Sequence, residues 1–203
     1  YEADKIYLDQ DLASVLTAKG KLAEAIQRLE AAAELNPDLP ILQLSLADLY
    51  AKTGRFDEAQ ATAERLLRVN RKLAPAWAVQ GTVHLQRARL EEAEGAFRMA
   101  VEADPQSLQA LYQLGRVQLL RNRRTEAMAS FRRLQQLDPK KQLGRVELLA
   151  LESGRDAATT GTAMAEDIRT RLQEQPDHPG LRTQLGALLL AQGKADEAEV
   201  EFR

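Results

Sequence analysis

The chain has 203 residues, of which 44% are hydrophobic and only 4% aromatic, and a formal net charge of -2 at pH 7. Its richness in Ala, Leu, Gln, Glu and Arg is typical of an all-helical protein, and the near-neutral charge argues against general affinity for nucleic acid. The sequence has no cysteine, which excludes disulfides and thiol chemistry, and no apolar run of eighteen residues, so we expect no membrane insertion by this segment.

Residue classes return every 34 positions along the first 140 residues. A small residue stands at Ala13, Ala47, Gly81 and Gly115, and a Glu-Ala pair at 24–25, 58–59, 92–93 and 126–127. Four residues after that Ala stands Leu29, Phe97 or Phe131, with Ala63 as the exception. The units end at Asn36-Pro37, Asp104-Pro105 and Asp138-Pro139, whereas Asn70-Arg71 lacks the proline. A fixed interval of this kind predicts one supersecondary unit repeated along the chain.

The clearest copy runs from Pro75 to Pro105. In its second half one helical face would carry Leu90, Ala93, Phe97, Ala100 and Val101, with Glu91, Glu94 and Arg98 directed away from it. Small residues let two helices approach closely, and a larger side chain fills the space between neighbouring turns. Each helix pair therefore buries its apolar face only by stacking on the next pair.

This pattern resembles the tetratricopeptide repeat (TPR) family, whose signature is W-x2-L-G-x2-Y, then A-x3-F, then P. Trp77, Gly81, Ala93, Phe97 and Pro105 match it. The departures are Gln80 at the Leu site and His84 and Gln118 at the Tyr site. The resemblance implies an all-α, right-handed solenoid of antiparallel helix pairs with about five to six repeats.

In chain order, we expect a single array over 1–203 with repeats at 6–39, 40–73, 74–107 and 108–141, an irregular repeat over 142–178 and a partial one over 179–203. The first repeat should contain helices at 6–19 and 22–35 separated by Gly20, and the second should turn at Gly54. Tyr1 and Phe202 both fall inside a second helix by repeat phase. We therefore expect a segment of a longer bacterial TPR protein, truncated at both ends.

The fifth repeat breaks the phase. The octet 142–149, QLGRVELL, differs at one position from 113–120, QLGRVQLL, but lies 29 residues later instead of 34. About eight extra residues then fall within 154–162, where Gly, Thr and Asp predict a long loop before a helix over 163–174. A tolerated insertion, a bend or partner-specific loop, and residues absent near Lys140-Lys141 all fit this pattern.

Catalytic chemistry is sparse in the sequence. The histidines are His84, at a packing site between helices, and His178, in a turn between Pro176 and Pro179. A metal site needs several converging ligands, which these residues do not provide, and no phosphate-binding loop or nucleophile motif appears. We therefore expect no metal, no cofactor and no enzyme activity.

The resemblance places a partner-binding groove along the first helices of successive repeats, where TPR proteins commonly bind peptides. Transferred by repeat phase, the groove sites are Tyr7, Gln10, Ser14, Thr17, Leu44, Asp48, Ala78, Thr82, Tyr112, Arg116, Leu119 and Arg145. The echoed octet puts Arg145 at the site of Arg116. The Lys/Asn/Arg clamp of TPR co-chaperones is absent, because Ser14, Leu44 and Ala78 stand among the corresponding sites.

The fourth repeat and its end are basic, so an acidic partner could be attracted there. Besides Arg116, the basic surface would comprise Arg121, Arg123, Arg124, Arg132, Arg133, Lys140 and Lys141. A charge run is also the ordinary composition of a solvated surface. We expect Arg116 and Arg145 to be the arginines that recognise carboxylates of the partner.

These observations predict a non-catalytic scaffold that binds another protein or a peptide segment through its groove. By analogy with other bacterial arrays, an envelope assembly such as exopolysaccharide export or pilus biogenesis is its expected setting. The compartment stays open, with the periplasm favoured over the cytoplasm. The alternatives are the recruiting arm of a larger, glycosyltransferase-like enzyme and a direct binder of an acidic polysaccharide. Self-association through unfinished array ends is a further expectation.

Overall fold

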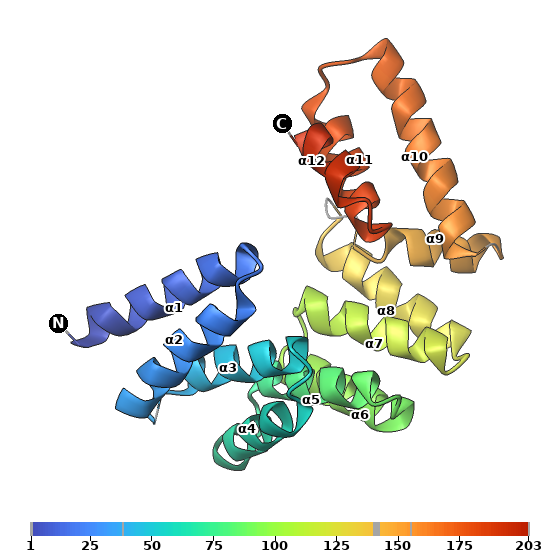
Figure 1. The fold of residues 1–203 in the computed structure, drawn as a ribbon. Coiled ribbons are helices and arrows are strands. Elements are labelled where there is room, and N and C mark those ends of the chain that lie inside the picture. Colours follow the sequence, from blue (N-terminus) through green and yellow to red (C-terminus); the bar gives the residue numbers. More distant parts are fainter. Residues whose placement is uncertain (1, 38, 140–142, 155, 203) are drawn as a thin grey trace. The chain divides into compact units, whose positions relative to one another are not determined.

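The computed structural model of the chain describes residues 2–37, 39–139, 143–154 and 156–202, and all regular elements within these ranges are α-helices (Figure 1). The predicted all-α repeat fold is therefore confirmed. The helices form two compact units, 1–121 and 122–203. That the repeats form one array remains a prediction.

The first unit stacks helices in sequence order. They are α1 (Glu2–Ala18), α2 (Leu22–Leu35), α3 (Pro40–Lys52), α4 (Phe56–Val69), α5 (Ala74–Gln86), α6 (Leu90–Ala103) and α7 (Leu108–Leu120). Each helix packs on the next, and α3 also packs on α5. The odd-numbered helices therefore make one layer and the even-numbered helices the other, which is the arrangement expected of stacked helix pairs.

The second unit contains the remaining helices. They are α8 (Arg124–Leu137), α9 (Arg145–Ser153), α10 (Ala157–Glu174), α11 (Pro179–Ala191) and α12 (Ala195–Phe202). Each again packs on its neighbour in sequence, and α10, α11 and α12 enclose a core around Ile168, Leu185 and Leu189.

The 34-residue series coincides with burial. The Ala of each Glu-Ala pair is fully buried, and so is the residue four positions later; these residues are Ala25, Ala59, Ala93 and Ala127, and Leu29, Ala63, Phe97 and Phe131. At the small-residue site, a Cβ added to Gly81 would lie 2.7 Å from ring carbons of Phe97. Small residues therefore recur every 34 positions because the helices approach too closely there for larger side chains.

The turns between repeats form as expected, including the one that lacks proline. Asn36, Asn70, Asp104 and Asp138 each follow the last residue of an even-numbered helix. After Asn70 the turn is held by side chains instead of a proline ring. The Asn70 Oδ1 accepts from the Lys72 N–H at 2.9 Å, and the Trp77 Nε1–H donates to the Arg71 carbonyl at 2.8 Å.

The prediction that Glu94 is directed away from the packed face of its helix is wrong, because its side chain is fully buried. Arg121, at the end of α7, donates to the Glu94 carboxylate at 2.5 Å and lies 3.7 Å from Glu91. One repeat earlier, Arg87 at the end of α5 pairs in the same way with Asp57 and Gln60 of α4. The neighbouring repeat therefore covers a face that looks solvated when one helix is considered alone.

The long loop predicted over 154–162 is wrong. Helix α10 begins at Ala157, because the Asp156 carboxylate caps it by accepting from the Thr159 N–H at 2.7 Å. Gly161 lies inside the helix, where a Cβ would come 3.0 Å from the Gln192 amide and 3.4 Å from Val146. The glycine marks a close contact between helices and not a loop.

The octet at 142–149 does not adopt the same structure as the similar octet at 113–120. Gly115 lies within α7, whereas Gly144 has φ +74° and directly precedes α9. A Cβ on Gly144 would lie 2.8 Å from the Phe131 ring of α8. Leu143 and Gly144 therefore form a turn before α9, and α9 has 9 residues where α7 has 13.

The first prediction concerns the contact between Gly81 and Phe97. We expect Gly81→Ala to lower the free energy of unfolding by about 2 kcal/mol, because the added Cβ would overlap the buried Phe97 ring and force it or the backbone to shift. Gly95→Ala in α6 is the matched control, since a Cβ there meets nothing within 4 Å, and it should raise stability by about 0.5–1 kcal/mol. Urea unfolding measures both, and equal effects would contradict the packing argument.

The second prediction concerns the buried carboxylate of Glu94. Arg121→Ala leaves this carboxylate with fewer donors, so we expect the free energy of unfolding to fall by about 1–3 kcal/mol. Arg124→Ala, at an exposed arginine of α8, should change it by less than about 0.5 kcal/mol. A loss in Arg121→Ala no larger than in this control would show that Glu94 does not depend on its partner.

Candidate functional site

Two adjoining hollows lie along the odd-numbered helices of the first unit. The smaller, of about 230 Å³, lies between α1 and α3 and is lined by the predicted residues Gln10, Ser14, Thr17 and Asp48. Helical spacing places Gln10, Ser14 and Thr17 on one face of α1. Tyr7 belongs to the same helix, but its side chain lies outside the described residues.

The larger hollow, of about 500 Å³, joins three successive odd-numbered helices. Of the predicted groove residues, Leu44 and Asp48 of α3 and Ala78 and Thr82 of α5 line it. Asp48 and Lys52 line both hollows, so the two are continuous. Repeat phase thus brings together residues that are up to 72 positions apart in the sequence.

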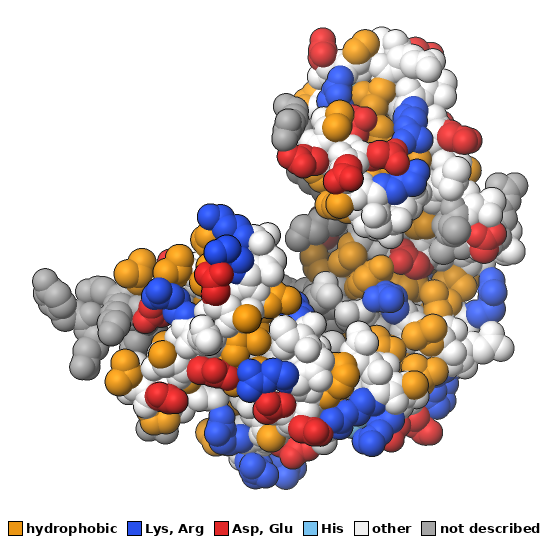
Figure 2. All heavy atoms as spheres, in the orientation of Figure 1, with side chains coloured by type: hydrophobic (Ala, Val, Ile, Leu, Met, Phe, Trp, Pro, Cys, Tyr) orange, Lys and Arg blue, Asp and Glu red, His pale blue; other side chains and the backbone are white. Residues whose placement is uncertain are grey.

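The walls of these hollows are mostly uncharged. The hydroxyls of Ser14, Thr17 and Thr82 each donate to a carbonyl one turn earlier in their own helix, at 2.8–3.0 Å. Asp48 and Lys52 neutralise one another through an ion pair of 2.6 Å. The face drawn in Figure 2 likewise shows acidic and basic side chains interspersed with hydrophobic ones over α1–α6. The first part of the groove is therefore polar without a net charge at its centre.

On α7 the groove residues differ from those expected. Gln109 and Gln113 line the larger hollow, whereas Tyr112, Arg116 and Leu119 do not. Arg116 lies beside this wall, since its guanidinium is 5.7 Å from the centre of the Tyr112 ring and donates to the Gln113 side chain at 3.2 Å. The i, i+4 spacing of the two glutamines was the sequence signal for this wall.

The predicted basic surface is only partly open. The Arg121 side chain is 19% exposed and pairs with Glu94, so it belongs to the scaffold and not to the exposed basic surface. Arg123 is half-buried, Arg124 and Arg133 are exposed, and Arg132 is exposed but pairs with Glu152 at 3.0 Å. Lys140 and Lys141 lie outside the described residues.

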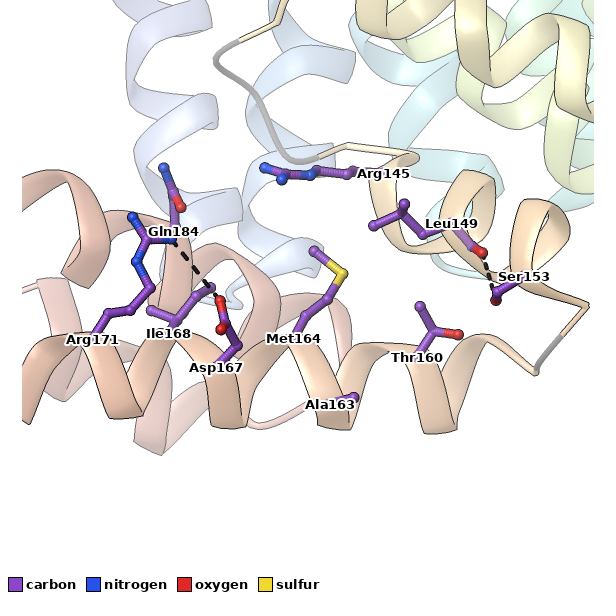
Figure 3. Close-up of a pocket in the computed structure, with 10 residues that line it drawn as sticks. All are labelled: Arg145, Leu149, Ser153, Thr160, Ala163, Met164, Asp167, Ile168, Arg171 and Gln184. Atoms are coloured by element: carbon purple, nitrogen blue, oxygen red, sulfur yellow. Dashed lines mark hydrogen bonds and ion pairs between the residues drawn. The ribbon is translucent and has the colours of Figure 1, made fainter.

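Arg145 lies in a different setting from Arg116. It is the first residue of α9 and lines a hollow between α9 and α10 in the second unit, whereas Arg116 is in the middle of α7 in the first (Figure 3). The prediction that they occupy equivalent sites is wrong, because Leu143 and Gly144 form a turn and α9 begins only at Arg145.

Positions equivalent to the family's tyrosine show why His84 packs differently from Tyr50. Tyr50 donates to the Glu30 carboxylate at 2.8 Å, and burial together with this bond raises its pKa to about 12. The Nδ1 of His84 is buried without a hydrogen-bond partner. Burial lowers the pKa of His84, opposed by Glu92 and Glu64 and assisted by Arg89 and Arg87. The imidazole is therefore held neutral between helices.

The described residues show neither a cluster of metal ligands nor a membrane span. Over the described ranges, no three His, Cys, Asp or Glu side chains are grouped so that they could hold a metal ion. His178 instead caps α11, where its Nδ1 accepts from the Leu181 N–H at 3.2 Å. Nor does any helix in that part of the chain have the length and hydropathy of a membrane span.

Family models decide what kind of protein this is. Three models described as tetratricopeptide repeat match residues 16–81, 78–141 and 179–203. The chain belongs to the tetratricopeptide repeat family. None of the three TPR matches covers residues 142–178, which contain the shortened α9 and lengthened α10. TPR proteins are generally non-catalytic scaffolds for protein interactions.

Solved TPR structures share the fold across almost the whole chain. The thermophilic TPR protein TTC0263 of Thermus thermophilus aligns with a TM-score of 0.60 and 20% identity, covering 97% of this chain and 87% of its own. A tetratricopeptide repeat protein from Parabacteroides merdae gives 0.57 and 18%, covering 98% and 77%. MamA from Desulfovibrio magneticus RS-1 gives 0.54 and 16%, covering 98% and 92%. No curated protein matches the sequence significantly.

The third prediction concerns the neutral imidazole of His84. Folding lowers the pKa of His84 from 6.5, so the folded state favours the neutral imidazole. The stability that depends on this neutral form is fully present above pH 6.5 and is lost as the pH falls through 6.5 towards the folded-state pKa. We expect the free energy of unfolding to fall more steeply between pH 7.5 and 5.5 in the native chain than in His84→Tyr. The tyrosine could reach Glu64, the counterpart of Glu30, as Tyr50 does.

Urea unfolding at several pH values measures this difference. His178 is present in both proteins, so the comparison isolates the change at position 84. Parallel pH profiles of the native chain and His84→Tyr would contradict the prediction.

Proposed function

We propose that this TPR chain is a non-catalytic scaffold that binds an extended segment of a partner protein along α1, α3, α5 and α7. The observation that carries the proposal is the pair of continuous hollows lined by these helices. They are joined at Asp48 and Lys52, so one extended chain could contact successive repeats. This is also the face through which repeat scaffolds ordinarily bind.

The lining favours a segment that offers backbone amides and small or aliphatic side chains. Leu44, Ala78 and Val79 give the larger hollow an apolar floor, while Gln109 and Gln113 stand on its wall. A glutamine amide both donates and accepts, so it can pair with the N–H and C=O groups of an extended backbone. Sequence specificity would then come from the pockets between helices.

Arg116 supplies the proposed preference for an acidic group. Its guanidinium is exposed beside Gln113, which lines the hollow, and the Tyr112 ring lies under it. A guanidinium in this position can bind a carboxylate through two hydrogen bonds. The carboxylate would lie at the edge of the groove, next to the apolar floor.

An envelope assembly of bacteria is the proposed setting. Its support is the Ala-, Arg- and Gln-rich composition without cysteine, together with the use of long TPR arrays as assembly scaffolds. The groove itself carries no information on the compartment.

The fourth prediction places a bulky charge in the groove. Peptides that bind the full chain are first selected from a displayed random library, and their affinities are then measured by fluorescence anisotropy. We expect Ala78→Arg in α5 to weaken groove-binding peptides tenfold or more, since its side chain would fill the floor of the larger hollow. Ala61→Arg on an exposed face of α4 is the matched control and should change affinity less than twofold.

Two outcomes would contradict the proposal. One is that Ala61→Arg weakens the peptides as much as Ala78→Arg, and the other is that no selected peptide is sensitive to Ala78→Arg. Thermal unfolding of both variants separates loss of the groove from loss of the fold.

A further inference from the structure

The turn between the second and third repeats differs in charge from the turns on either side of it. Residues 65–72, at the end of α4 and in this turn, contain four basic residues and no acidic one. The equivalent residues 31–38 and 99–106 each contain two acidic residues and no basic one. Arg71 stands where the neighbouring turns have proline. The four basic residues, called the basic edge below, are Arg65, Arg68, Arg71 and Lys72.

The side chains of the basic edge are exposed, and none of them forms an ion pair with another described residue. Arg65 donates to the neutral side chain of Gln43. Glu64, the nearest acidic residue along α4, accepts from the Gln60 amide at 2.9 Å instead of pairing with an arginine. In Figure 2 basic side chains gather at the lower edge of the view, where α4 lies. The basic edge therefore presents positive charge to a partner.

Stabilisation of the fold accounts for only part of this charge. Arg68 lies in the last turn of α4, where a cation interacts favourably with the helix dipole. Arg71 and Lys72 lie beyond the end of the helix. The bonds that hold their turn use backbone atoms, since the Lys72 N–H donates to Asn70 and the Arg71 carbonyl accepts from Trp77. The turn is therefore held without the two basic side chains.

An exposed aliphatic side chain accompanies the basic edge. Val69 is 86% exposed and lies between Arg68 and the turn. Neither Val69 nor any residue of the basic edge lines the two hollows of the groove. A small molecule ordinarily binds in a concave pocket, so this open surface suits a macromolecule.

Acidic residues on both sides limit the size of an anionic partner. Glu34 of the preceding repeat and Glu102 and Asp104 of the following one are exposed at equivalent sites. An anionic bilayer or a nucleic acid duplex extends over more than one repeat and would meet these carboxylates, which repel it. A short acidic segment of a protein meets only the basic edge. Complementary charge over one repeat therefore favours such a segment.

We propose that the basic edge, together with Val69, is a surface that binds a short acidic segment of a partner protein. Carboxylates of the segment bind the guanidinium groups through paired hydrogen bonds and the Lys72 ammonium as a point charge. An aliphatic side chain of the segment packs on Val69. A segment displaced by one repeat meets like charge, so the flanking carboxylates fix its position. This surface is separate from the groove, and the inference does not rest on the proposed function.

The test uses the full chain and a fluorescein-labelled acidic peptide, Asp-Glu-Leu-Asp-Glu-Glu, whose dissociation constant is measured by anisotropy at low ionic strength. The amide counterpart Asn-Gln-Leu-Asn-Gln-Gln shows whether binding depends on carboxylates. A double variant, Arg71→Gln with Lys72→Gln, removes two charges that lie beyond the helix. The matched control, Lys19→Gln with Lys21→Gln, removes two exposed charges from the turn between α1 and α2.

We expect the acidic peptide to bind at least tenfold more tightly than its amide counterpart. An exposed ion pair contributes up to about fivefold to an equilibrium constant, so the double variant should weaken the acidic peptide by about tenfold. The control should weaken it less than twofold. Arg71→Pro, which restores the residue of the neighbouring turns, should weaken it by about threefold. Circular dichroism melts confirm that each variant is folded.

The proposal is overturned if the acidic peptide does not bind the native chain, or if the control weakens it as much as the double variant. It is also overturned if vesicles of equal parts phosphatidylglycerol and phosphatidylcholine, or a short DNA duplex, bind more tightly than the peptide and lose binding in the double variant. An extended polyanion would then be the partner.

Peptides that bind the groove, identified by their sensitivity to Ala78→Arg, distinguish the two surfaces. We expect the double variant to bind them unchanged, since none of its altered residues lines the hollows. Equal weakening of groove peptides and the acidic peptide in the double variant would contradict a separate surface. Failure of the groove itself leaves the result with the acidic peptide unaffected.

Discussion

The close approach of two helices at a small residue is the constraint on which the rest of this structure depends. Gly81 leaves space for the Phe97 ring, and Ala93, one turn before Phe97 in α6, is fully buried. Because an α-helix buries only one stripe, each pair must present this stripe to the next at a constant spacing. A larger residue at position 81 would displace a ring that is itself fully buried. This constant spacing of the stacked helix pairs is the reason that residue types recur every 34 positions.

Some charged side chains stabilise the scaffold and others lie along the groove, and the sequence alone does not distinguish the two groups. Arg87 and Arg121 occupy the same position in successive repeats, and each reaches back to acidic or amide groups of the preceding even-numbered helix. Such pairs fix one repeat against the next, and the burial of Glu94 makes its pairing necessary for stability. The hollows along the odd-numbered helices are lined by hydroxyls, amides and an internally neutralised Asp48–Lys52 pair, and Arg116 of α7 is exposed beside the larger hollow. Because the paired arginines lie within the scaffold and not in the hollows, the groove is left available for a partner.

Irregularity in the fifth repeat creates the features that distinguish this chain from a uniform array. The first copy of the octet, 113–120, forms the C-terminal part of α7, whereas in the second copy Leu143 and Gly144 form a turn before α9. A local sequence compatible with both conformations takes the one that lets the chain leave the preceding helix, as the contact between Gly144 and Phe131 shows. The extra residues after α9 lengthen α10 to 18 residues.

The sequence by itself determined the family, the helix pairs of the regular repeats and the phase of their buried residues. These features depend on contacts that recur at a fixed interval, so several copies reinforce one pattern; the bounds of α2 agree with the predicted 22–35 for this reason. Phase also predicted that residues such as Ser14, Asp48 and Ala78 would line continuous hollows, because equivalent positions of stacked repeats face the same side.

Only the tertiary structure decided the features that depend on a neighbouring element. The burial of Glu94 requires Arg121 from the next repeat, and the glutamine wall of α7 depends on how that helix faces α5. Asp156 and Gly161 resemble loop residues until the cap and the contact with Gln192 are seen. Arg145 shares its octet with Arg116, but its position was set by the turn after α8. A repeat pattern predicts the contacts that are common to its family. The conformation of a residue that departs from the pattern depends instead on the specific neighbour against which it packs.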